Sequence, residues 1–555
     1  METRFTPLLA TNYAPSKAEV DEIRKLLVDP VNQLNQFDTE INHLHRVLNE
    51  LTSKRNQLHA QIISHKNLIA PLRRIPQELL QEIFIHCLPT DHNAAMSCHE
   101  PPLLLGRVCS RWRSVALSTP RLWSGIHIVI GSIPSQEGLE SVDQIPDVHA
   151  AVEEWLGRSG GLPLSISLFQ APYTITNQEY VDNLISTLVQ FSSRWRNMSL
   201  LLSSQPPSLL FSLSHQTFPL LERFSFHGVT ADSPSPFPEL APLDIFRAPR
   251  IKSTSSHHLG TLPKNMGWSQ LTFLSLESCG YGEGRLTPSK AIEILHESPG
   301  LIHCEFNFIS GWNSPSSIDH EIVTMPSLVT LAIFEGTISL KPFFEHLRLP
   351  VLASLEFAAT PRRHPHPDDP EEPSICTLLS RIDSLKELTL SSLNLTHTTL
   401  VNCLQRASSI TRLSVLNPQP ADSWPFFIAT LSPFTDDVVS LLTPTEDQPP
   451  MCPLLRVLEC NPCNASDTAL LTLIKQRSTY ASKYDIQPLE RVDLEFHRQR
   501  SMDIRSKLPP KALVETAITL KYRTPPDVPR ISLRAGLERP GRLQIPSNTY
   551  RHLHR

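Results

Sequence analysis

Residues 75–88 read IPQELLQEIFIHCL, residues 105–113 read LGRVCSRWR, and residues 120–123 read PRLW. Pro76 suits the first position of a helix, where the missing N–H group of proline costs no hydrogen bond. Apolar side chains then recur at steps of three and four residues, at Leu79, Leu80, Ile83, Phe84, Cys87 and Leu88. This spacing predicts an amphipathic helix of about three and a half turns.

A second amphipathic helix is expected further along, with Leu104, Leu105, Val108, Trp112, Val115 and Ala116 on one side. Thr119-Pro120 then begins a short third turn that carries Leu122 and Trp123. Three helices this short cannot bury all their apolar surface against one another, because about 40 residues are too few for a self-sufficient core. The remaining apolar face therefore needs a partner, unless the segment is a plain helical hairpin inside a larger core.

With these motifs the segment resembles an F-box, and its second half is especially similar to the F-box proteins that are numerous in mushroom-forming fungi. The resemblance covers about a tenth of the chain. It implies a substrate receptor of a ubiquitin ligase, which binds a Skp-type adaptor and, through it, a cullin scaffold with a RING subunit. The implied adaptor-binding residues are Ile75, Pro76, Leu79, Leu80, Ile83 and Phe84 in the first helix, with Val108, Trp112 and Leu122 in or beside the same joint.

Two features depart from the family pattern. Ile75 stands where leucine is usual, a change that nearly conserves side-chain volume. The segment between the first two helices, residues 89–102, is about nine residues longer than in short family members. We expect this polar loop to bulge into solvent, because the entropy cost of closing a loop grows slowly with its length.

The composition is that of an ordinary globular protein with two to four domains: 555 residues, 40% hydrophobic, 19% charged and a net charge of -5. Nucleic acid is not an expected partner, because the chain has no overall excess of Lys and Arg over Asp and Glu. No run of 18 apolar residues and no signal peptide is visible, so we expect no membrane association and a cytoplasmic or nuclear location, or both. The cysteines are then expected to be reduced thiols.

A heptad pattern precedes the F-box-like segment. Val20, Leu27, Leu34, Ile41, Leu48 and Ile62 share one position, and Ile23, Phe37, Leu44, Leu51 and Leu58 share the other. This pattern predicts a coiled-coil helix over residues 16–67, after a disordered segment at 1–15. Pro30 lies on the seam and is expected to break the helix, which leaves a continuous part from about Val31 to His65. The seam either joins two copies of the chain as a homodimer or folds back on its own chain.

After an F-box domain at residues 68–126, the order apolar-x-x-apolar-x-apolar returns eleven times, mostly 22 to 34 residues apart. Copies include Leu221/Phe224/Phe226, Leu243/Phe246/Ala248 and Leu328/Leu331/Ile333. Helical patterns lie between the copies, at 179–191, 288–296, 375–382, 398–406 and 465–476. We therefore expect an α/β fold in which residues 127–498 form an irregular leucine-rich-repeat solenoid of parallel strands alternating with helices. The alternative is an α/β fold without repeats.

No catalytic motif accompanies the repeats, and neither an enzyme activity nor a cofactor is expected. Residues 364–373 alternate His, Pro, Asp and Glu, and we interpret them as an extended solvated loop rather than a metal site. Cys460 and Cys463 have no second ligand pair at zinc spacing, so no metal is expected there. Residues 499–555 are rich in Arg and Pro and are expected to form a loosely ordered basic tail.

The outward positions of the predicted strands suggest where a substrate binds. Among the sixteen such positions from Leu271 onward, six are acidic and none is basic. The position just ahead adds Glu387, Arg412 and Arg491, which reduces the acidic excess. We expect a mildly acidic face with Glu305, Glu356 and Asp493 near its centre that binds a basic protein segment. The alternative is that these acids only keep an open sheet soluble.

The sequence therefore predicts a non-catalytic substrate receptor made of a coiled coil, an F-box and a solenoid. Its partners would be the Skp-type adaptor and an unidentified protein substrate. The alternative is a scaffold protein that joins partners through its coiled coil and solenoid and takes no part in a ligase.

Overall fold

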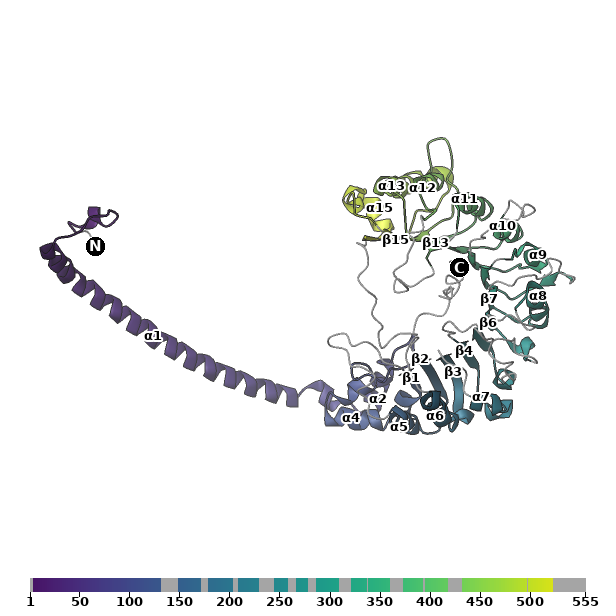
Figure 1. Ribbon diagram of the computed structural model, residues 1–555, viewed down its shortest axis with the longest axis horizontal. Helices are drawn as coiled ribbons and strands as arrows, with labels where there is room; N and C mark the ends of the chain where they lie inside the picture. Colours follow the sequence, from purple (N-terminus) through teal and green to yellow (C-terminus); the bar gives the residue numbers. More distant parts are fainter. Residues whose placement is uncertain are drawn as a thin grey trace. The chain divides into compact units, whose positions relative to one another are not determined.

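The protein is described here by a computed structural model (Figure 1). It describes residues 3–130, 148–170, 178–202, 208–228, 244–257, 266–277, 286–308, 321–336, 338–359, 373–392, 395–417, 432–496 and 498–522. The chain divides into two compact units, Met1–Leu80 and Gln81–Arg555. Residues 364–372 of the His- and Pro-rich segment, and the tail beyond Tyr522, lie outside the described residues.

The first unit is dominated by one long helix, α1 (Lys17–Leu68). Ser16 and Glu19 form a capping box at its start, in which each side chain satisfies a backbone N–H group of the first turn. The predicted break at Pro30 is wrong, because the helix continues through it. An interior proline removes one hydrogen bond and crowds the carbonyl four residues earlier, at a cost of about 3 kcal/mol. Strong helix formers such as Leu26, Leu27 and Leu34 surround Pro30 and favour the helix on both sides of it.

The predicted disorder of residues 1–15 is also wrong for the described part, residues 3–15. The 3-10 turn η1 (Thr6–Leu8) begins with a hydrogen bond from the Thr6 N–H to the Thr3 carbonyl at 2.9 Å. Arg4 forms an ion pair with Glu22 of α1, and Phe5 is buried. These contacts hold the segment against the first turns of α1. The unit ends with η2 (Pro71–Arg74) and the start of α2 (Gln77–His86).

The second unit begins with short helices and continues as one large parallel sheet. The helices are the remainder of α2, then α3 (Leu103–Gly106), α4 (Ser110–Leu117) and η3 (Pro120–Trp123). The sheet has 14 strands in the order β1-β2-β3-β4-β5-β6-β7-β9-β11-β12-β13-β14-β15-β16, and each described pair is parallel. Their bounds are β1 (Gly125–Ile130), β2 (Leu164–Gln170), β3 (Trp195–Leu202), β4 (Arg223–Gly228), β5 (Ser253–His257), β6 (Phe273–Glu277), β7 (His303–Phe308), β9 (Thr330–Glu335), β11 (Ser354–Ala359), β12 (Glu387–Ser391), β13 (Arg412–Leu416), β14 (Val457–Asn461), β15 (Arg491–Phe496) and β16 (Ala517–Tyr522). Strands β8 (Val323–Thr324) and β10 (Leu347–Arg348) form a separate two-stranded sheet.

Helices join consecutive strands along one side of the sheet. They are α5 (Val148–Arg158), α6 (Gln178–Val189), α7 (Ser208–Ser212), α8 (Pro288–Glu297), α9 (Lys341–Glu345), α10 (Ser374–Leu379), α11 (His397–Arg406), α12 (Asp436–Leu442), α13 (Asp467–Tyr484), α14 (Ile504–Lys507) and α15 (Pro510–Glu515). In Figure 1 the labelled strands follow the inner side of a curved array and the helices follow its outer side. The second unit is therefore a mixed α/β array compatible with a solenoid-like fold.

One repeated apolar position explains the regular strand order. The pairing of β6 through β15 places Leu274, Cys304, Leu331, Leu355, Leu388, Leu413, Leu458 and Val492 in a single row across the sheet. Every side chain in this row is at most 1% exposed. A slip by one residue in any strand would move its apolar side chain to the opposite face, so this row fixes the register.

Ten of the eleven predicted strand copies match observed strands, and the copy at Leu243 is wrong. Asp244–Arg247 is the 3-10 turn η7, and the strand of that repeat is β5, where Thr254 and Ser256 take the buried positions. Strands β1, β2 and β16 were not predicted. The expected loose tail is wrong for its first part, because residues 499–522 contain α14, α15 and β16, and β16 is the last strand of the sheet.

Asp467 shows how residues 498–522 are attached. Its carboxylate, at the start of α13, accepts hydrogen bonds from Arg498 (2.6 Å), from the Ser501 side chain (2.6 Å) and N–H (2.9 Å), and from the Tyr522 hydroxyl (3.1 Å). Burial alone would raise the pKa of Asp467, but the bonds from Arg498 and Ser501 outweigh it and hold this pKa well below its usual value. Burial of Tyr522 and the negative charge of Asp467 raise the pKa of the Tyr522 hydroxyl to about 12. A charged, fully bonded Asp467 therefore fixes this segment to the sheet.

Candidate functional site

Helix α2 presents apolar side chains on two faces. Leu80 and Phe84 are fully buried, whereas Leu79 is 57% exposed and Ile83 is 43% exposed. Leu79 and Ile83 are four residues apart, so they lie on the same face of the helix. Pro76 precedes the helix instead of occupying its first position, and its carbonyl accepts the first helical bond from the Leu80 N–H at 3.1 Å. Leu80 and Phe84 therefore anchor α2 in the fold, while Leu79 and Ile83 remain available for contact with another protein.

Aromatic packing holds the short helices of the second unit together. The rings of Phe84 and Trp112 have centroids 4.8 Å apart, and Leu122 is fully buried. The Trp123 indole N–H donates to the Ala116 carbonyl at 2.9 Å. The rings of Trp123 and Trp155, a residue of α5, pack edge to face with their centroids 4.8 Å apart. Trp123 thereby joins the helical segment to the solenoid-like array, and the segment from Gln81 onward belongs to the same compact unit.

The predicted second helix is in fact two helices, α3 and α4. Cys109 between them is extended, with φ -162° and ψ 169°, and its sulfur accepts a hydrogen bond from the Trp112 N–H at 3.5 Å. An N-cap residue must leave the helical conformation, which ends any continuous helix at that point. The break leaves Val108 55% exposed, while Trp112 is half-buried.

The loop at residues 89–102 does not bulge into solvent, contrary to expectation. The Ala94 carbonyl accepts from the His127 N–H at 2.8 Å, and Ala95 forms a parallel bridge with His127 of β1. The Asn93 side chain donates to Ser167 of β2 at 3.1 Å. The extra residues therefore cover the edge strand β1, which would otherwise present unpaired backbone groups. This pairing fastens the loop to the sheet.

The predicted adaptor-binding residues thus divide into two groups. Pro76, Leu79, Ile83 and Val108 are exposed and Ile75 and Trp112 are half-buried, whereas Leu80, Phe84 and Leu122 are buried in the fold. The prediction omitted Leu104 and Leu117, which are 41% and 42% exposed. It placed Leu104 on the apolar side of the second helix without an adaptor-binding role, and it did not single out Leu117. The buried residues support the segment, and the exposed ones are candidates for direct contact.

The predicted substrate residues lie in one row on the other face of the sheet. Parallel pairing aligns Glu305, Ala332, Glu356, Thr389, Ser414, Glu459 and Asp493 from β7 to β15. Glu305, Glu356 and Asp493 are all half-buried. The position two residues further along these strands is different. Glu277 in β6 is 3% exposed and Glu495 in β15 is 9% exposed, so the expectation that these two side chains face solvent is wrong.

Arginines neutralise part of this row. Arg412 is 2.9 Å from a carboxylate oxygen of Glu459 and 3.6 Å from one of Glu387, and Arg491 pairs with Asp493. Glu305 accepts a hydrogen bond from Ser275 at 3.0 Å. The part of the row from β13 to β15 therefore carries charges of both signs.

Within the described ranges no group of three or more His, Cys, Asp or Glu side chains is arranged to hold a metal ion. In the same part of the chain, no helix has the length and apolar character needed to cross a membrane. No protein-family model matches the sequence, and comparison with curated proteins finds no similar sequence.

Proposed function

We propose that residues 75–123 are an F-box and that the chain is a substrate receptor of a Skp-cullin-F-box ubiquitin ligase. The observation that carries the proposal is the division of α2, where Leu80 and Phe84 are buried while Leu79 and Ile83 stay exposed. An isolated exposed leucine is common, but two aliphatic side chains on one helix face, in a motif with the F-box order of residues, favour a docking role.

The second part of the proposal is that residues 127–522 are a leucine-rich-repeat-like domain that holds the substrate. Its regular parallel strands support this interpretation, because solenoids commonly use their curved sheet face for binding. The chain would contribute no side chain to ubiquitin transfer. It would raise the concentration of a bound protein near the charged ubiquitin-conjugating enzyme.

Co-expression with a Skp-type adaptor tests the docking role. The full chain should co-purify with the adaptor in an equimolar complex that survives size-exclusion chromatography. A chain that purifies without adaptor when the adaptor is in excess would reject the F-box assignment. The scaffold function, in which the chain only joins other partners, would then be the better account.

A further inference from the structure

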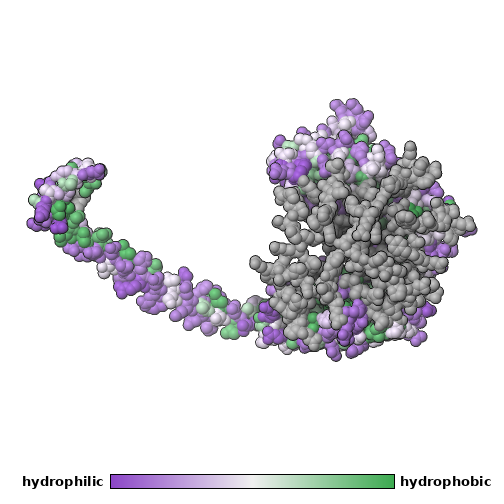
Figure 2. Space-filling model, in the orientation of Figure 1, coloured by the Kyte–Doolittle hydropathy of each residue, from purple (hydrophilic) through white to green (hydrophobic). Residues whose placement is uncertain are grey.

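Helix α1 exposes its apolar seam along almost its whole length. Nine seam residues are between 43% and 61% exposed, and none of α1 is buried. They are Leu27, Leu34, Phe37, Ile41, Leu44, Leu48, Leu51, Leu58 and Ile62. Figure 2 shows apolar residues in green recurring among polar ones along this helix. No residue of α1 is buried, so no other part of Met1–Leu80 covers this seam. The experiments below distinguish its two expected occupants, a second copy and the chain's own second unit.

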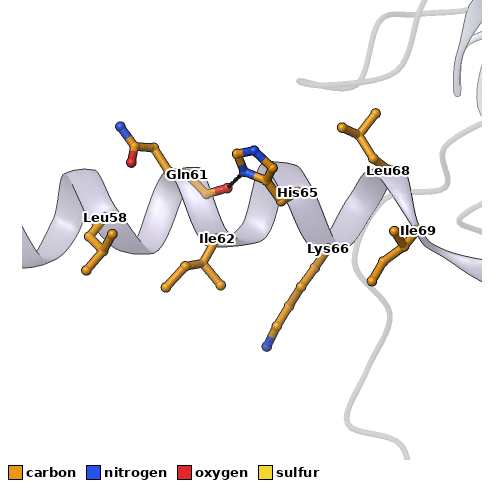
Figure 3. Close-up of a pocket in the computed structure, with 7 residues that line it drawn as sticks. All are labelled: Leu58, Gln61, Ile62, His65, Lys66, Leu68 and Ile69. Carbon is orange, nitrogen blue, oxygen red and sulfur yellow. Dashed lines mark hydrogen bonds between the residues drawn. The ribbon is translucent and has the colours of Figure 1, made fainter.

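The surface near the end of α1 has the form of a coiled-coil socket. Figure 3 shows a shallow hollow lined in part by Leu58, Gln61, Ile62 and His65, with Leu58 and Ile62 pointing to the same side of the helix. In the heptad these are two consecutive d positions with the g and a positions between them. Four residues in this arrangement form the hole that receives one side chain of a facing helix. The occupant of the seam is therefore expected to be another heptad helix.

The charges of α1 indicate which helix fits. Residues 17–40 carry six acidic and three basic side chains, whereas residues 41–68 carry one acidic and four basic side chains. A second copy that runs in the opposite direction brings the acidic half of each helix beside the basic half of the other. A parallel copy brings like halves together, which like-charge repulsion disfavours.

Pro30, Arg55 and His65 interrupt the apolar seam, and two of them, Pro30 and Arg55, match in the antiparallel arrangement. When Ile41 faces Leu44 of the second copy, Arg55 faces Pro30 of that copy, so a long side chain lies opposite a short one and can extend toward water. The same register places Ile23 of the second copy over the Figure 3 hollow, opposite Ile62. In a parallel pair the two Arg55 side chains would face each other in the seam.

We propose that α1 forms an antiparallel coiled coil with a second copy of this chain, centred between Asn42 and His43. The nine exposed seam residues of each copy, at roughly 50 Å² each, would together remove about 900 Å² from water. Flanking side chains beside the seam add to this area and bring the pair toward the roughly 1,200 Å² at which the range of specific protein interfaces begins. The 52 residues of α1 span about 78 Å, so the two chains leave the pair at well-separated ends. This proposal does not depend on the F-box assignment.

The first experiment measures the mass of the full-length protein by light scattering. The wild-type chain should have twice the monomer mass, and Leu44→Asp with Leu48→Asp should halve it, because charges cannot remain buried in the seam. The control is Asn42→Asp with Asn49→Asp, which adds the same charge outside the seam and should leave the dimer intact. A wild-type monomer, or a dimer that survives the seam substitutions, would overturn the proposal.

The second experiment determines direction by pulsed electron-paramagnetic-resonance distances between spin labels in the full-length protein. The labels are attached to an unnatural amino acid, which leaves the native cysteines untouched. Labels at Lys25 should lie about 50 Å apart in the antiparallel pair, since 35 residues of helix separate the two sites. Labels at Asn42 should lie within about 20 Å. Short distances at both sites would show a parallel dimer and would refute the antiparallel arrangement.

Discussion

Replacing Leu79 and Ile83 of α2 by alanine should weaken adaptor binding without weakening the fold. Leu79 is 57% exposed and Ile83 is 43% exposed, so about half of each side chain is still available for burial by a partner. Full burial of such a side chain is worth about 1.5–3 kcal/mol, which makes the available half worth about 1 kcal/mol each. Loss of about 2 kcal/mol corresponds to roughly 30-fold weaker binding.

Isothermal titration calorimetry of the purified chain with a Skp-type adaptor measures this change. The matched control is Ile302→Ala with Val351→Ala, which removes similar exposed apolar surface from the solenoid-like array, at 49% and 41% exposure. Both variants should keep the wild-type melting temperature within a few degrees. The reasoning is refuted if the α2 variant binds within twofold of wild type, or if the control loses as much affinity.

Three further predictions concern the second unit. Arg477 is fully buried, and burial lowers its pKa to about 10. Its guanidinium donates hydrogen bonds of 3.0–3.2 Å to the carbonyls of Leu442, Cys452, Pro453, Leu455 and Gln487. Arg477→Met should therefore reduce the free energy of unfolding by about 3–5 kcal/mol in urea titrations, and a loss below about 1 kcal/mol would contradict this role. The pKa of Asp467 is lower in the folded state than in the unfolded chain, so its stabilising effect is present above pH about 4 and is lost as the pH falls below that value. The stability difference between wild type and Asp467→Asn should therefore shrink between pH 5 and pH 3, and a difference that is constant with pH would argue against a charged Asp467. Finally, Glu305→Lys with Glu356→Lys should change the set of proteins that co-purify with the chain while the adaptor stays bound, and an unchanged set would place substrate binding elsewhere.

The strands were predictable where their buried positions are apolar. Leu331, Leu355 and Leu388 recur in the sequence because each fills the same row of the core. All three residues are 0% exposed. Strand β5 escaped the pattern because Thr254 and Ser256 take its buried positions. The nearby Phe246 matched the pattern from within a 3-10 turn, so local spacing alone gave the wrong strand.

Other errors arose where tertiary contacts decide the outcome. The loop at 89–102 is polar and reads as solvated, yet hydrogen bonds from Asn93 and to Ala94 fix it on the sheet. Pro30 reads as a helix break, because its ring removes a hydrogen bond and crowds the preceding turn, yet the 52-residue helix α1 continues through it. In α2 the spacing identified four apolar residues, but it could not divide the buried Leu80 and Phe84 from the exposed Leu79 and Ile83.

Adaptor-dependent capture of a cullin tests the central claim most directly. The immobilised full-length chain is incubated with a purified cullin–RING complex, with and without a Skp-type adaptor, and the bound cullin is quantified. We expect stoichiometric cullin only when the adaptor is present, and a strong reduction with Leu79→Ala and Ile83→Ala. Absence of cullin with the adaptor in excess, or equal capture without the adaptor, would contradict the account of this chain as a ligase substrate receptor.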